Sequence, residues 1–302
     1  MKKIELVTKR GSNIATYIYD DIQNPKAVIQ IIHGASEFLK RYESFIDFLN
    51  KNNYIVIGCD NLGHGDSCHA DANYIHFEST EAYEAQVIVK EYIEKTYQEL
   101  PIYLFGHSMG SFLARKLLID YPKTYAKGIM SGTTSVSFCI GALADTLCFT
   151  SKVFRGPKGI SPLLTKQGVP SFTKKMEKRK LIKDGEMWIT HDENIVKEYK
   201  NSPKCGENFT ITAMQGLLKW AKYVSSKNKV TKGDHSTPIL FISGSDDPVS
   251  NFGKDIEKTV NLYKKCNYYF IESIIYNNMR HEVLNELDRE KVYNDCVQFF
   301  DK

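Results

Sequence analysis

The chain has 302 residues, 42% of them hydrophobic and 25% charged, which are the proportions of an ordinary soluble globular protein. Its formal net charge of +4 is small for this length and argues against a nucleic-acid-binding surface. No apolar run approaches the roughly 18 residues that cross a bilayer, and charged residues interrupt any signal-peptide pattern at the N-terminus. Seven cysteines without short-spaced pairs indicate reduced thiols rather than a disulfide or zinc framework, so we expect a cytoplasmic protein.

The first third of the chain alternates strand and helix patterns. Two short strands joined at Gly11-Ser12-Asn13 form a predicted antiparallel pair, and two nearly continuous apolar runs after them are typical of strands buried on both faces. Between these runs, apolar residues at three- and four-residue spacing predict a helix from Phe38 to Leu49. The predicted strands are 4–7, 14–19, 27–32 and 54–59. A helix is predicted over 79–98, with an inner side formed by Tyr83, Val87, Val89, Tyr92, Ile93 and Tyr97.

The alternation continues with an apolar run from Ile102, a helical pattern from Ser111 and a strand at 126–131. It resumes after a long interval with strands at 238–244 and 268–271 and helices at 249–263 and 285–300. Strands that alternate with helices predict an α/β fold with a doubly wound, mostly parallel sheet.

The interval between residues 131 and 237 is far longer than a single crossover helix needs, so it is expected to be an insertion with its own structure. We therefore predict a core of residues 1–131 and 237–302 and an inserted, mainly helical segment at 132–236. Its apolar stretch 136–154 either packs on the core or lines a substrate pocket. The basic stretch 174–183 is either a solvated face or a surface that attracts anionic headgroups.

The chain is organised around Gly106-His107-Ser108-Met109-Gly110, a Gly-x-Ser-x-Gly pattern between a predicted strand and a predicted helix. That context is typical of a nucleophile elbow, in which the tight turn presents the serine hydroxyl. Glycines are needed on either side because a β-carbon there would collide with the neighbouring strand and helix.

A serine nucleophile needs a base, and the base needs a carboxylate that orients it. In hydrolases built on such an elbow these residues follow the serine in the order acid, then histidine. Gly244-Ser245-Asp246-Asp247 follows a predicted strand, and His281 lies after the last one. We choose Asp247 as the orienting acid, while one of the two aspartates could instead cap the helix that follows.

Acyl transfer also needs two donors for the oxyanion of the tetrahedral intermediate. The backbone amide of Met109 is one candidate, and that of Ala35, in the loop after strand 27–32, is the other. Gly34 lets the backbone of this loop approach closely, and His33 and Glu37 are interpreted as its hydrogen-bonding scaffold. His107 and Gly110 complete the elbow motif.

Five ordered motifs resemble the monoacylglycerol lipase and lysophospholipase-like branch of the α/β-hydrolases, which overlaps with the serine aminopeptidase S33-type hydrolases. They are His33-Gly34-Ala35-Ser36-Glu37 with Arg41-Tyr42, Asp60 with Gly63-His64-Gly65-x-Ser67, the Gly106–Gly110 elbow, Gly244-x-x-Asp247, and His281. Ser36 and Phe38 stand where the first loop of this family often has glycine and histidine.

The resemblance covers essentially the whole chain except the insertion. It implies a triad of Ser108, Asp247 and His281 with oxyanion amides at Ala35 and Met109. It also implies hydrolysis of a lipid ester through an acyl-enzyme, with the insertion as a cap that holds the acyl chain above the serine. A serine triad needs no metal and no cofactor, and the small net charge gives no reason to expect a nucleic-acid partner. Transient contact of the cap with a membrane surface is compatible with this interpretation.

Three other interpretations remain open. Within the hydrolases, the chain could be a short-chain carboxylesterase or an aminopeptidase. An aminopeptidase needs a pair of carboxylates in the cap to bind the substrate ammonium. The only acidic cluster there is Asp192-Glu193, so a lipid substrate is favoured. Outside catalysis, it could be a catalytically silent hydrolase fold used for binding. His64 and His69 with Asp60 and Asp66 resemble a metal cluster, but the surrounding glycines favour a tight turn instead.

Overall fold

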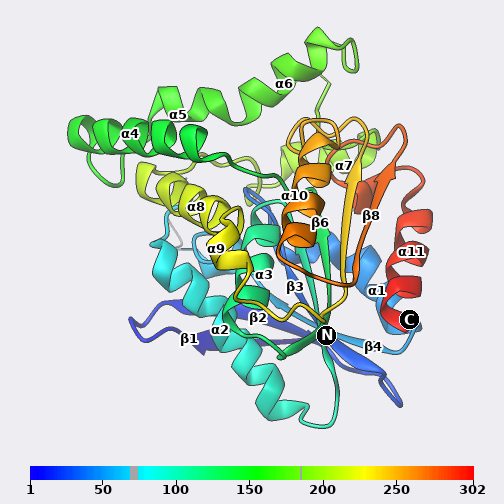
Figure 1. Ribbon diagram of the computed structural model, residues 1–302. Coiled ribbons are helices and arrows are strands. Elements are labelled where there is room, and N and C mark those ends of the chain that lie inside the picture. The colour runs from blue at the N-terminus through cyan, green and yellow to red at the C-terminus, as the bar shows by residue number, and fades with distance from the viewer. Residues whose placement is uncertain (69–73, 184–185) are drawn as a thin grey trace.

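The computed structural model describes residues 1–68, 74–183 and 186–302 and contains one eight-stranded sheet (Figure 1). Its strand order is β1-β2-β4-β3-β5-β6-β7-β8, and every pair is parallel except β1/β2 and β2/β4. The strands are β1 (Lys2–Val7), β2 (Asn13–Tyr19), β3 (Ala27–Ile32), β4 (Tyr54–Cys59), β5 (Ile102–His107), β6 (Tyr125–Ser131), β7 (Ile239–Gly244) and β8 (Ile271–Tyr276). The predicted α/β class with a mostly parallel sheet is confirmed.

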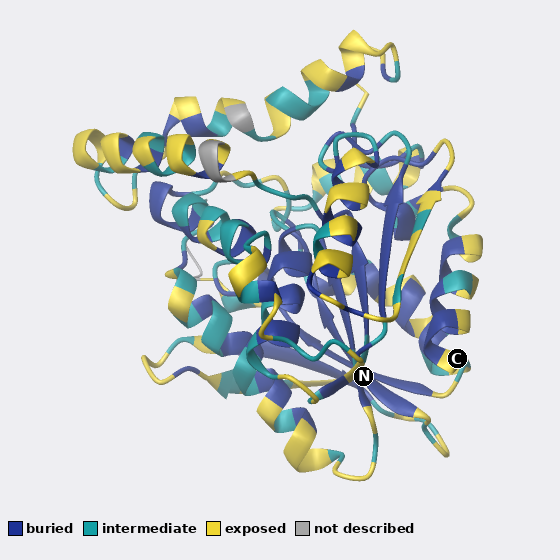
Figure 2. Ribbon diagram, viewed as in Figure 1, coloured by how far each residue is buried: buried dark blue, intermediate teal, exposed yellow. Residues whose placement is uncertain are grey.

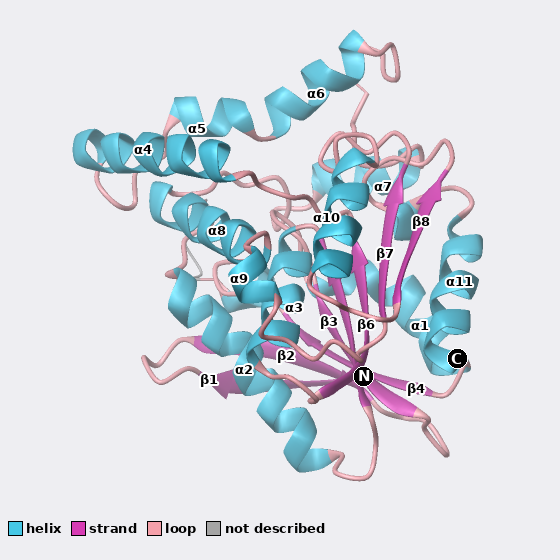
Figure 3. Ribbon diagram, in the orientation of Figure 1, coloured by secondary structure: helices cyan, strands magenta, loops and turns pink. Residues whose placement is uncertain are grey.

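Helices cover both faces of the sheet, as a doubly wound fold requires (Figure 3). One face is covered by α2 (Ser79–Thr96), α3 (Met109–Asp120) and α10 (Lys254–Lys265), and α8 (Ile211–Val224) packs on α2 and α3. The other is covered by α1 (Glu43–Lys51) and α11 (Arg289–Asp301). Strands β3 and β4 are buried along their whole length because both faces are covered, which explains their continuous apolar sequences.

Between β6 and β7 the described chain is helical. The helices are α4 (Phe138–Arg155), α5 (Pro162–Gln167), α6 (Val169–Lys178), α7 (Glu193–Asn201), α8 and α9 (Lys227–Val230). In Figure 1, α4, α5 and α6 extend above and beyond the sheet, whereas α8 lies on α3 and α2. No helix within the described ranges is both long and apolar enough to span a bilayer.

Several element boundaries differ from the prediction. The last strand is β8 at Ile271–Tyr276 rather than 268–271, since Tyr269 and Phe270 are exposed and only Tyr268 is buried. The predicted helix at 249–263 begins at Lys254, because Asn251, Phe252 and Gly253 have positive φ. The predicted helix at 285–300 likewise begins later, at Arg289, after a short 3-10 turn (η3, Val283–Asn285).

The inner side of α2 also differs in part from the prediction. Val89 and Ile93 are buried as expected, but the four other predicted residues are only half-buried. The small side chains of Ala82 and Ala85 and the polar Gln86 take the buried positions instead. Close packing of α2 against the sheet favours small residues there, and the tyrosines lie at the margins.

Candidate active site

Ser108 lies on the sharp turn between β5 and α3. Its backbone has φ 50° and ψ −117°, a conformation that costs a residue with a β-carbon about 1–3 kcal/mol and persists only when its surroundings impose it. The Ser108 amide donates to the carbonyl of Ser131 over 2.8 Å, which ties the turn to the neighbouring strand β6. The residue is partly exposed, whereas His107 and Met109 on either side of it are buried.

Two glycines allow α3 to approach the sheet closely at this turn. A β-carbon on Gly110 would lie 2.1 Å from the carbonyl oxygen of Ile32, and one on Gly106 would lie 2.6 Å from that of Gly110. Both distances are shorter than van der Waals contact, and the opposing atoms belong to the backbone, so a side chain at either position would force the helix away from the strands.

His281 and Asp247 form a buried hydrogen-bonded pair. Nδ1 of His281 lies 2.9 Å from Oδ1 of Asp247, and the two residues are 3% and 0% exposed. Asp247 also accepts hydrogen bonds from the Ser243 hydroxyl and the Val249 amide. Burial opposes the charge of Asp247, but His281 and these donors outweigh it and lower the pKa of the carboxyl below its usual range. Asp247 is therefore an ionised acceptor aimed at the imidazole.

The neighbouring Asp246 is placed differently. Its carboxylate accepts a hydrogen bond from Ser245, and its amide donates to the carbonyl of Met279. Neither aspartate caps the following helix, because α10 starts after Gly253 and has no side-chain cap. The alternative role of helix cap is thus wrong for both residues, since the left-handed turn before α10 moves its first amides away from them.

The imidazole of His281 is set up to accept a proton. Burial lowers its pKa, but the charge and hydrogen bond of Asp247 more than offset this effect and raise the pKa above the ordinary 6.5. Because Nδ1 faces the carboxylate, it carries the proton, and Nε2 is the nitrogen left to act as a base.

The loops after five parallel strands converge at this point. The His281 ring lies 4.7 Å from that of His107, between ring centroids. A β-carbon on Gly132, after β6, would lie 2.7 Å from Cε1 of His281. One on Gly34, after β3, would lie 3.2 Å from Cβ of Ser108. The structure thus brings Ser108, His281, Asp247 and the predicted oxyanion loop to the same edge of the sheet, where ligands bind in open α/β folds.

The oxyanion loop is held by its two predicted scaffold residues. Asn61 donates its amide to Nε2 of His33, so Nδ1 of His33 carries the proton and donates to the carbonyl of Gly34 over 2.8 Å. The carboxylate of Glu37 accepts the Gly34 amide over 2.6 Å. With the carbonyl of the Gly34-Ala35 peptide fixed by His33, the Ala35 N–H points to the opposite side of that peptide plane. Met109 is the first residue of α3, where amides have no partner within the helix.

Ser36 explains one departure from the family pattern. It has φ 57°, a left-handed conformation that favours glycine, but its hydroxyl donates to the carbonyl of Glu207 over 2.9 Å. The Gly206 amide in turn donates to the Ser36 carbonyl. Serine at this position therefore lacks the conformational freedom of glycine, but its hydroxyl forms a hydrogen bond to the insertion that glycine could not form.

A buried ionic group beside the site was not expected from the sequence. Arg41 donates to Glu37 and, through two nitrogens, to Glu282, the residue after the candidate base. Burial opposes the charge of Glu282, but Arg41 outweighs it and lowers the pKa of Glu282 to about 2. Arg41-Tyr42 was noted only as part of a motif, and no local pattern connects it with a residue 241 positions away.

Trp188 is a second residue that sequence analysis missed. It comes from the insertion, is 8% exposed, and its ring lies 5.1 Å from that of His281. Its indole N–H is buried without a hydrogen-bond partner. Nothing in the sequence around it indicates that this part of the insertion reaches the site.

The metal interpretation is not supported by the described residues. Asp60 accepts the amides of Leu39 and Asp66, and Asp66 pairs with Lys3 and Lys204. Burial lowers the pKa of His64 to about 3. Among residues 1–68, 74–183 and 186–302 no group of three potential metal ligands is found, and His69 lies outside them.

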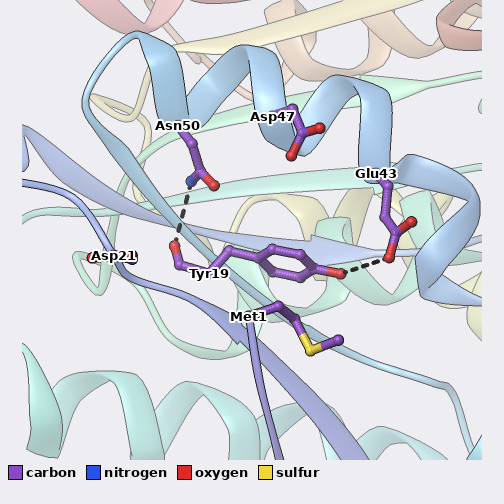
Figure 4. Close-up of a pocket in the computed structure, with 6 residues that line it drawn as sticks. All are labelled: Met1, Tyr19, Asp21, Glu43, Asp47 and Asn50. Carbon is purple, nitrogen blue, oxygen red and sulfur yellow. Dashed lines mark hydrogen bonds between the residues drawn. The ribbon is translucent and has the colours of Figure 1, made fainter.

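Two surface cavities lie elsewhere. One of about 250 Å³ is bordered by Met1, Tyr19, Asp21, Glu43, Asp47 and Asn50 (Figure 4). Another of about 680 Å³ lies between β8 and the start of α11. Neither contains a predicted site residue, and the hydrogen bonds within the first join only Tyr19 to Glu43 and Asn50.

Comparison with known proteins adds a family and a fold. The model of the family described as serine aminopeptidase, S33, matches residues 23–288. Among solved structures, a carboxyl esterase from Bacillus coagulans superimposes with a TM-score of 0.89 at 22% identity, over 99% of this chain and 97% of the esterase. That likeness shows the fold, which is the α/β-hydrolase fold.

The relatives similar in sequence include a phospholipase and a monoglyceride lipase. Phospholipase YtpA of Bacillus subtilis is 26% identical over 282 residues, which are 92% of this chain and 96% of the phospholipase. The monoglyceride lipase of Mus musculus is 30% identical over 131 residues, which are 41% of this chain and 40% of the lipase.

Proposed function

The chain belongs to the serine aminopeptidase S33 family, and from this premise we propose that it is a serine hydrolase of lipid carboxylic esters, namely monoacylglycerol or lysophospholipid. The observation that carries the proposal is the buried His281–Asp247 pair on loops that converge with the elbow of Ser108. A phospholipase relative of nearly full length and a monoglyceride lipase relative of partial length support the lipid substrate.

The reaction has two steps. The hydroxyl of Ser108 attacks the ester carbonyl while Nε2 of His281 takes its proton, and the amides of Ala35 and Met109 hold the oxyanion. The intermediate collapses to the acyl-enzyme, and His281 returns the proton to the departing alcohol. Water then attacks the acyl-enzyme with His281 again as base, which releases the fatty acid and restores Ser108. Asp247 stays ionised and stabilises the imidazolium.

The ester substrate is favoured over the free N-terminus of a peptide by the fate of the acidic cluster. Asp192 caps α7 by accepting the Asn194 and Ile195 amides, and its other oxygen pairs with Arg289 over 2.9 Å. Its charge is thereby already satisfied, so Asp192 does not offer a substrate ammonium a free carboxylate, and Glu193 is exposed in the first turn of α7. A short-chain carboxylesterase remains the alternative within the same chemistry.

The insertion, residues 132–236, is proposed to be the cap of the site. Trp188 packs against His281, and the carbonyl of Ile189 accepts the Glu282 amide over 2.7 Å. On the other side of the site, Ser36 is bonded to Glu207. The insertion thus contacts both the histidine loop and the oxyanion loop, which supports its role in enclosing a substrate.

The outer side of the cap is proposed to contact a lipid surface. It carries an exposed apolar patch on and around α4, α5 and α6, largely yellow in Figure 2, in which Phe154 is 86% exposed. The exposed apolar patch consists of Ile140, Leu143, Phe149, Val153, Phe154, Ile160, Leu163 and Val169. Exposed basic residues accompany it, namely Arg155, Lys158, Lys166, Lys174, Lys175, Lys178, Arg179, Lys180 and Lys183. Apolar side chains beside basic ones suit an interface with anionic headgroups.

The location is proposed to be cytoplasmic. Every cysteine that is described is a free thiol, including the buried Cys59, Cys148, Cys266 and Cys296. Free thiols support a reducing compartment.

The test of the proposed function is a hydrolysis panel on the wild type and Ser108→Ala. The substrates are p-nitrophenyl esters of several chain lengths, monoacylglycerol, lysophosphatidylcholine and an aminoacyl anilide. We expect the wild type to hydrolyse a long-chain glyceride or lysophospholipid and Ser108→Ala to lose about 10³-fold or more in kcat with an unchanged circular dichroism spectrum.

Other outcomes select the alternatives. Hydrolysis of short esters alone would make the protein a carboxylesterase, and hydrolysis of the anilide would make it an aminopeptidase. An inert wild type whose Ser108 does not react with a fluorophosphonate would indicate a binding protein. Full activity of Ser108→Ala would refute the assignment of the nucleophile.

A further inference from the structure

Arg41 lies where the oxyanion loop meets the loop of His281. Resting on the proposed function, we propose that Arg41 is a positioning residue that fixes these two loops relative to each other by bridging Glu37 and Glu282. The first carboxylate accepts the Gly34 amide, one residue before the Ala35 amide in the oxyanion loop, and the second belongs to Glu282, which directly follows the base in sequence.

The contacts form a continuous chain of short hydrogen bonds. Glu37 accepts the Gly34 amide and the Tyr42 hydroxyl on one oxygen, at 2.6 and 2.7 Å, and Arg41 on the other at 2.6 Å. The guanidinium of Arg41 then reaches both oxygens of Glu282, at 2.8 and 2.6 Å. Tyr199 of the insertion covers the guanidinium, with its ring centroid at 4.9 Å.

Burial makes this bridge rigid. The side chains of Arg41, Glu37 and Glu282 are 9%, 3% and 7% exposed, so water does not compete freely for their charges. A planar guanidinium that donates two parallel hydrogen bonds to one carboxylate and a third bond to another fixes the angle between them as well as the distance. Separating any one group would leave a buried charge unpaired, which is strongly unfavourable.

A fixed position of the oxyanion loop relative to the histidine loop matters for the proposed reaction. The Ala35 oxyanion amide and the base act on the same tetrahedral intermediate, yet they belong to loops after different strands, β3 and β8. A misplacement of about 1 Å between catalytic groups can cost about 100-fold in rate. A bridge between the two loops protects that alignment without touching the substrate.

The bridge also alters the charge around the base. The charged or titratable groups that face His281 are Asp247, His107, Glu282 and Glu37. One arginine neutralises only one of the two bridging carboxylates, so the group keeps a net negative charge beside the imidazole. Replacing Glu282 by glutamine removes that charge, whereas replacing Arg41 by lysine preserves it.

The first experiment is a double-mutant cycle with Arg41→Met, Glu282→Gln and the double variant, assayed on a p-nitrophenyl ester that the wild type hydrolyses. We expect each single substitution to lower kcat about tenfold with little change in KM. The double variant should lose no more than the worse single variant, because the two residues act as a unit. Losses that multiply would show that the residues act independently and would overturn the proposal.

Arg41→Lys covers the case in which Arg41→Met does not fold. Lysine keeps the charge but cannot hold both carboxylates in a fixed fork, so we expect a folded protein whose kcat is still lowered about tenfold. Wild-type kcat in this variant would mean that charge alone suffices and would overturn the positioning role. Asp192→Asn is the matched control, since its ion pair with Arg289 also joins the insertion to α11 while the Asp192 side chain contacts neither loop, and kcat should stay within about twofold.

A second readout does not depend on turnover. In ¹⁵N-labelled protein, Glu282→Gln should shift the amide resonances of Gly34 and Ala35 on the other loop, and Asp192→Asn should not. Glu282→Gln should also lower the pH at which the His281 ring titrates, and Arg41→Lys should leave it in place. Unchanged Gly34 and Ala35 resonances would overturn the bridge even in an active enzyme. Shifted resonances in a protein without hydrolase activity would support the bridge while refuting the proposed function.

Discussion

His281 has carboxylates on more than one side. Asp247 accepts a hydrogen bond from its Nδ1, and the negative charges of Glu282 and Glu37 also favour the protonated imidazole. Together they outweigh burial and raise the pKa of the imidazole above 6.5. His107, whose ring lies 4.7 Å away, has its pKa lowered to about 4 by burial and by His281, so it stays neutral where His281 titrates.

The activity should therefore depend on pH in a defined direction. The base must be neutral to accept a proton, so we expect kcat/KM to rise with pH through a midpoint above 6.5. Asp247→Asn removes the main charge that raises this pKa, so the midpoint should fall and kcat should drop about 10⁴-fold. A pH–rate profile of both proteins on one ester tests this. A wild-type midpoint below 6.5, or an unmoved one in Asp247→Asn, would contradict the assignment.

At the scale of single residues, the sequence indicates the catalytic candidates because their order along the chain is fixed: serine, then acid, then histidine. Ser108, Asp247 and His281 were chosen that way, and the structure places them at one edge of the sheet, with Asp247 rather than Asp246 bonded to the imidazole. Arg41–Glu282 and Trp188–His281 could not be found, because they join residues 241 and 93 positions apart without any local pattern.

Helix α3 depends on glycine where it crosses the sheet. A β-carbon on Gly110 would meet two backbone carbonyl oxygens, those of Ile32 at 2.1 Å and His33 at 2.5 Å. The helix would have to move away from β3, which carries the oxyanion loop at its end. Gly128 of β6 offers a comparison, since a β-carbon there would lie closest to the flexible ends of Met130 and Leu118, at 3.1 and 3.2 Å, and would meet the backbone oxygen of Leu104 only at an ordinary 3.9 Å.

We expect Gly110→Ala to lower the free energy of unfolding by about 3 kcal/mol or more and to reduce kcat, because backbone atoms cannot give way as side chains can. Gly128→Ala should cost about 1 kcal/mol and leave kcat nearly unchanged. Urea denaturation combined with ester hydrolysis measures both quantities. Equal destabilisation by the two substitutions would show that close approach at the elbow is not what requires glycine.

Strands buried on both faces were predicted to within one residue, whereas the edge strand β8 was not. The runs 27–32 and 54–59 coincide with β3 and β4, which helices cover on both faces. Strand β8 lies at the edge of the sheet and is largely exposed, so its sequence mixes polar and apolar residues and gave no clear signal. The aromatic residues at 268–270 are more typical of a strand, so the predicted strand covers them instead.

At the scale of the whole molecule, the break in the strand–helix alternation after β6 could be predicted from the sequence, but the contacts of the residues that follow could not. The break was visible in the sequence, since β6 ends at Ser131 and β7 begins at Ile239. Which parts of the insertion contact the site depends on packing between residues that lie far apart in the sequence. In the structure, the stretch with Trp188 and the stretch with Glu207 contact the site, while α4, α5 and α6 extend outward (Figure 1).

This outward part leads to a prediction about lipid surfaces. Five apolar side chains of α4 are exposed by 63–86% in place of packing on the core, and each of the nearby basic residues can add roughly 1 kcal/mol of attraction near an anionic bilayer. We expect the protein to cosediment with vesicles that contain phosphatidylserine or phosphatidylglycerol, more strongly than with phosphatidylcholine vesicles, and to dissociate partly at high salt, which screens the charges.

The paired variant Phe149→Ser/Phe154→Ser should weaken this binding while leaving hydrolysis of a dissolved short ester unchanged. Its matched control is Tyr269→Ser/Phe270→Ser, two aromatic residues 72% and 59% exposed just before β8, whose loss should not affect binding. Both variants replace two exposed aromatic side chains by serine, which removes apolar area without adding charge. A difference in vesicle binding between them would therefore show that the position of the exposed apolar patch matters, and not only the total exposed apolar area. Equal binding by all three proteins would mean that the exposed apolar patch does not contact the bilayer, because neither the aromatic side chains nor their position would then matter.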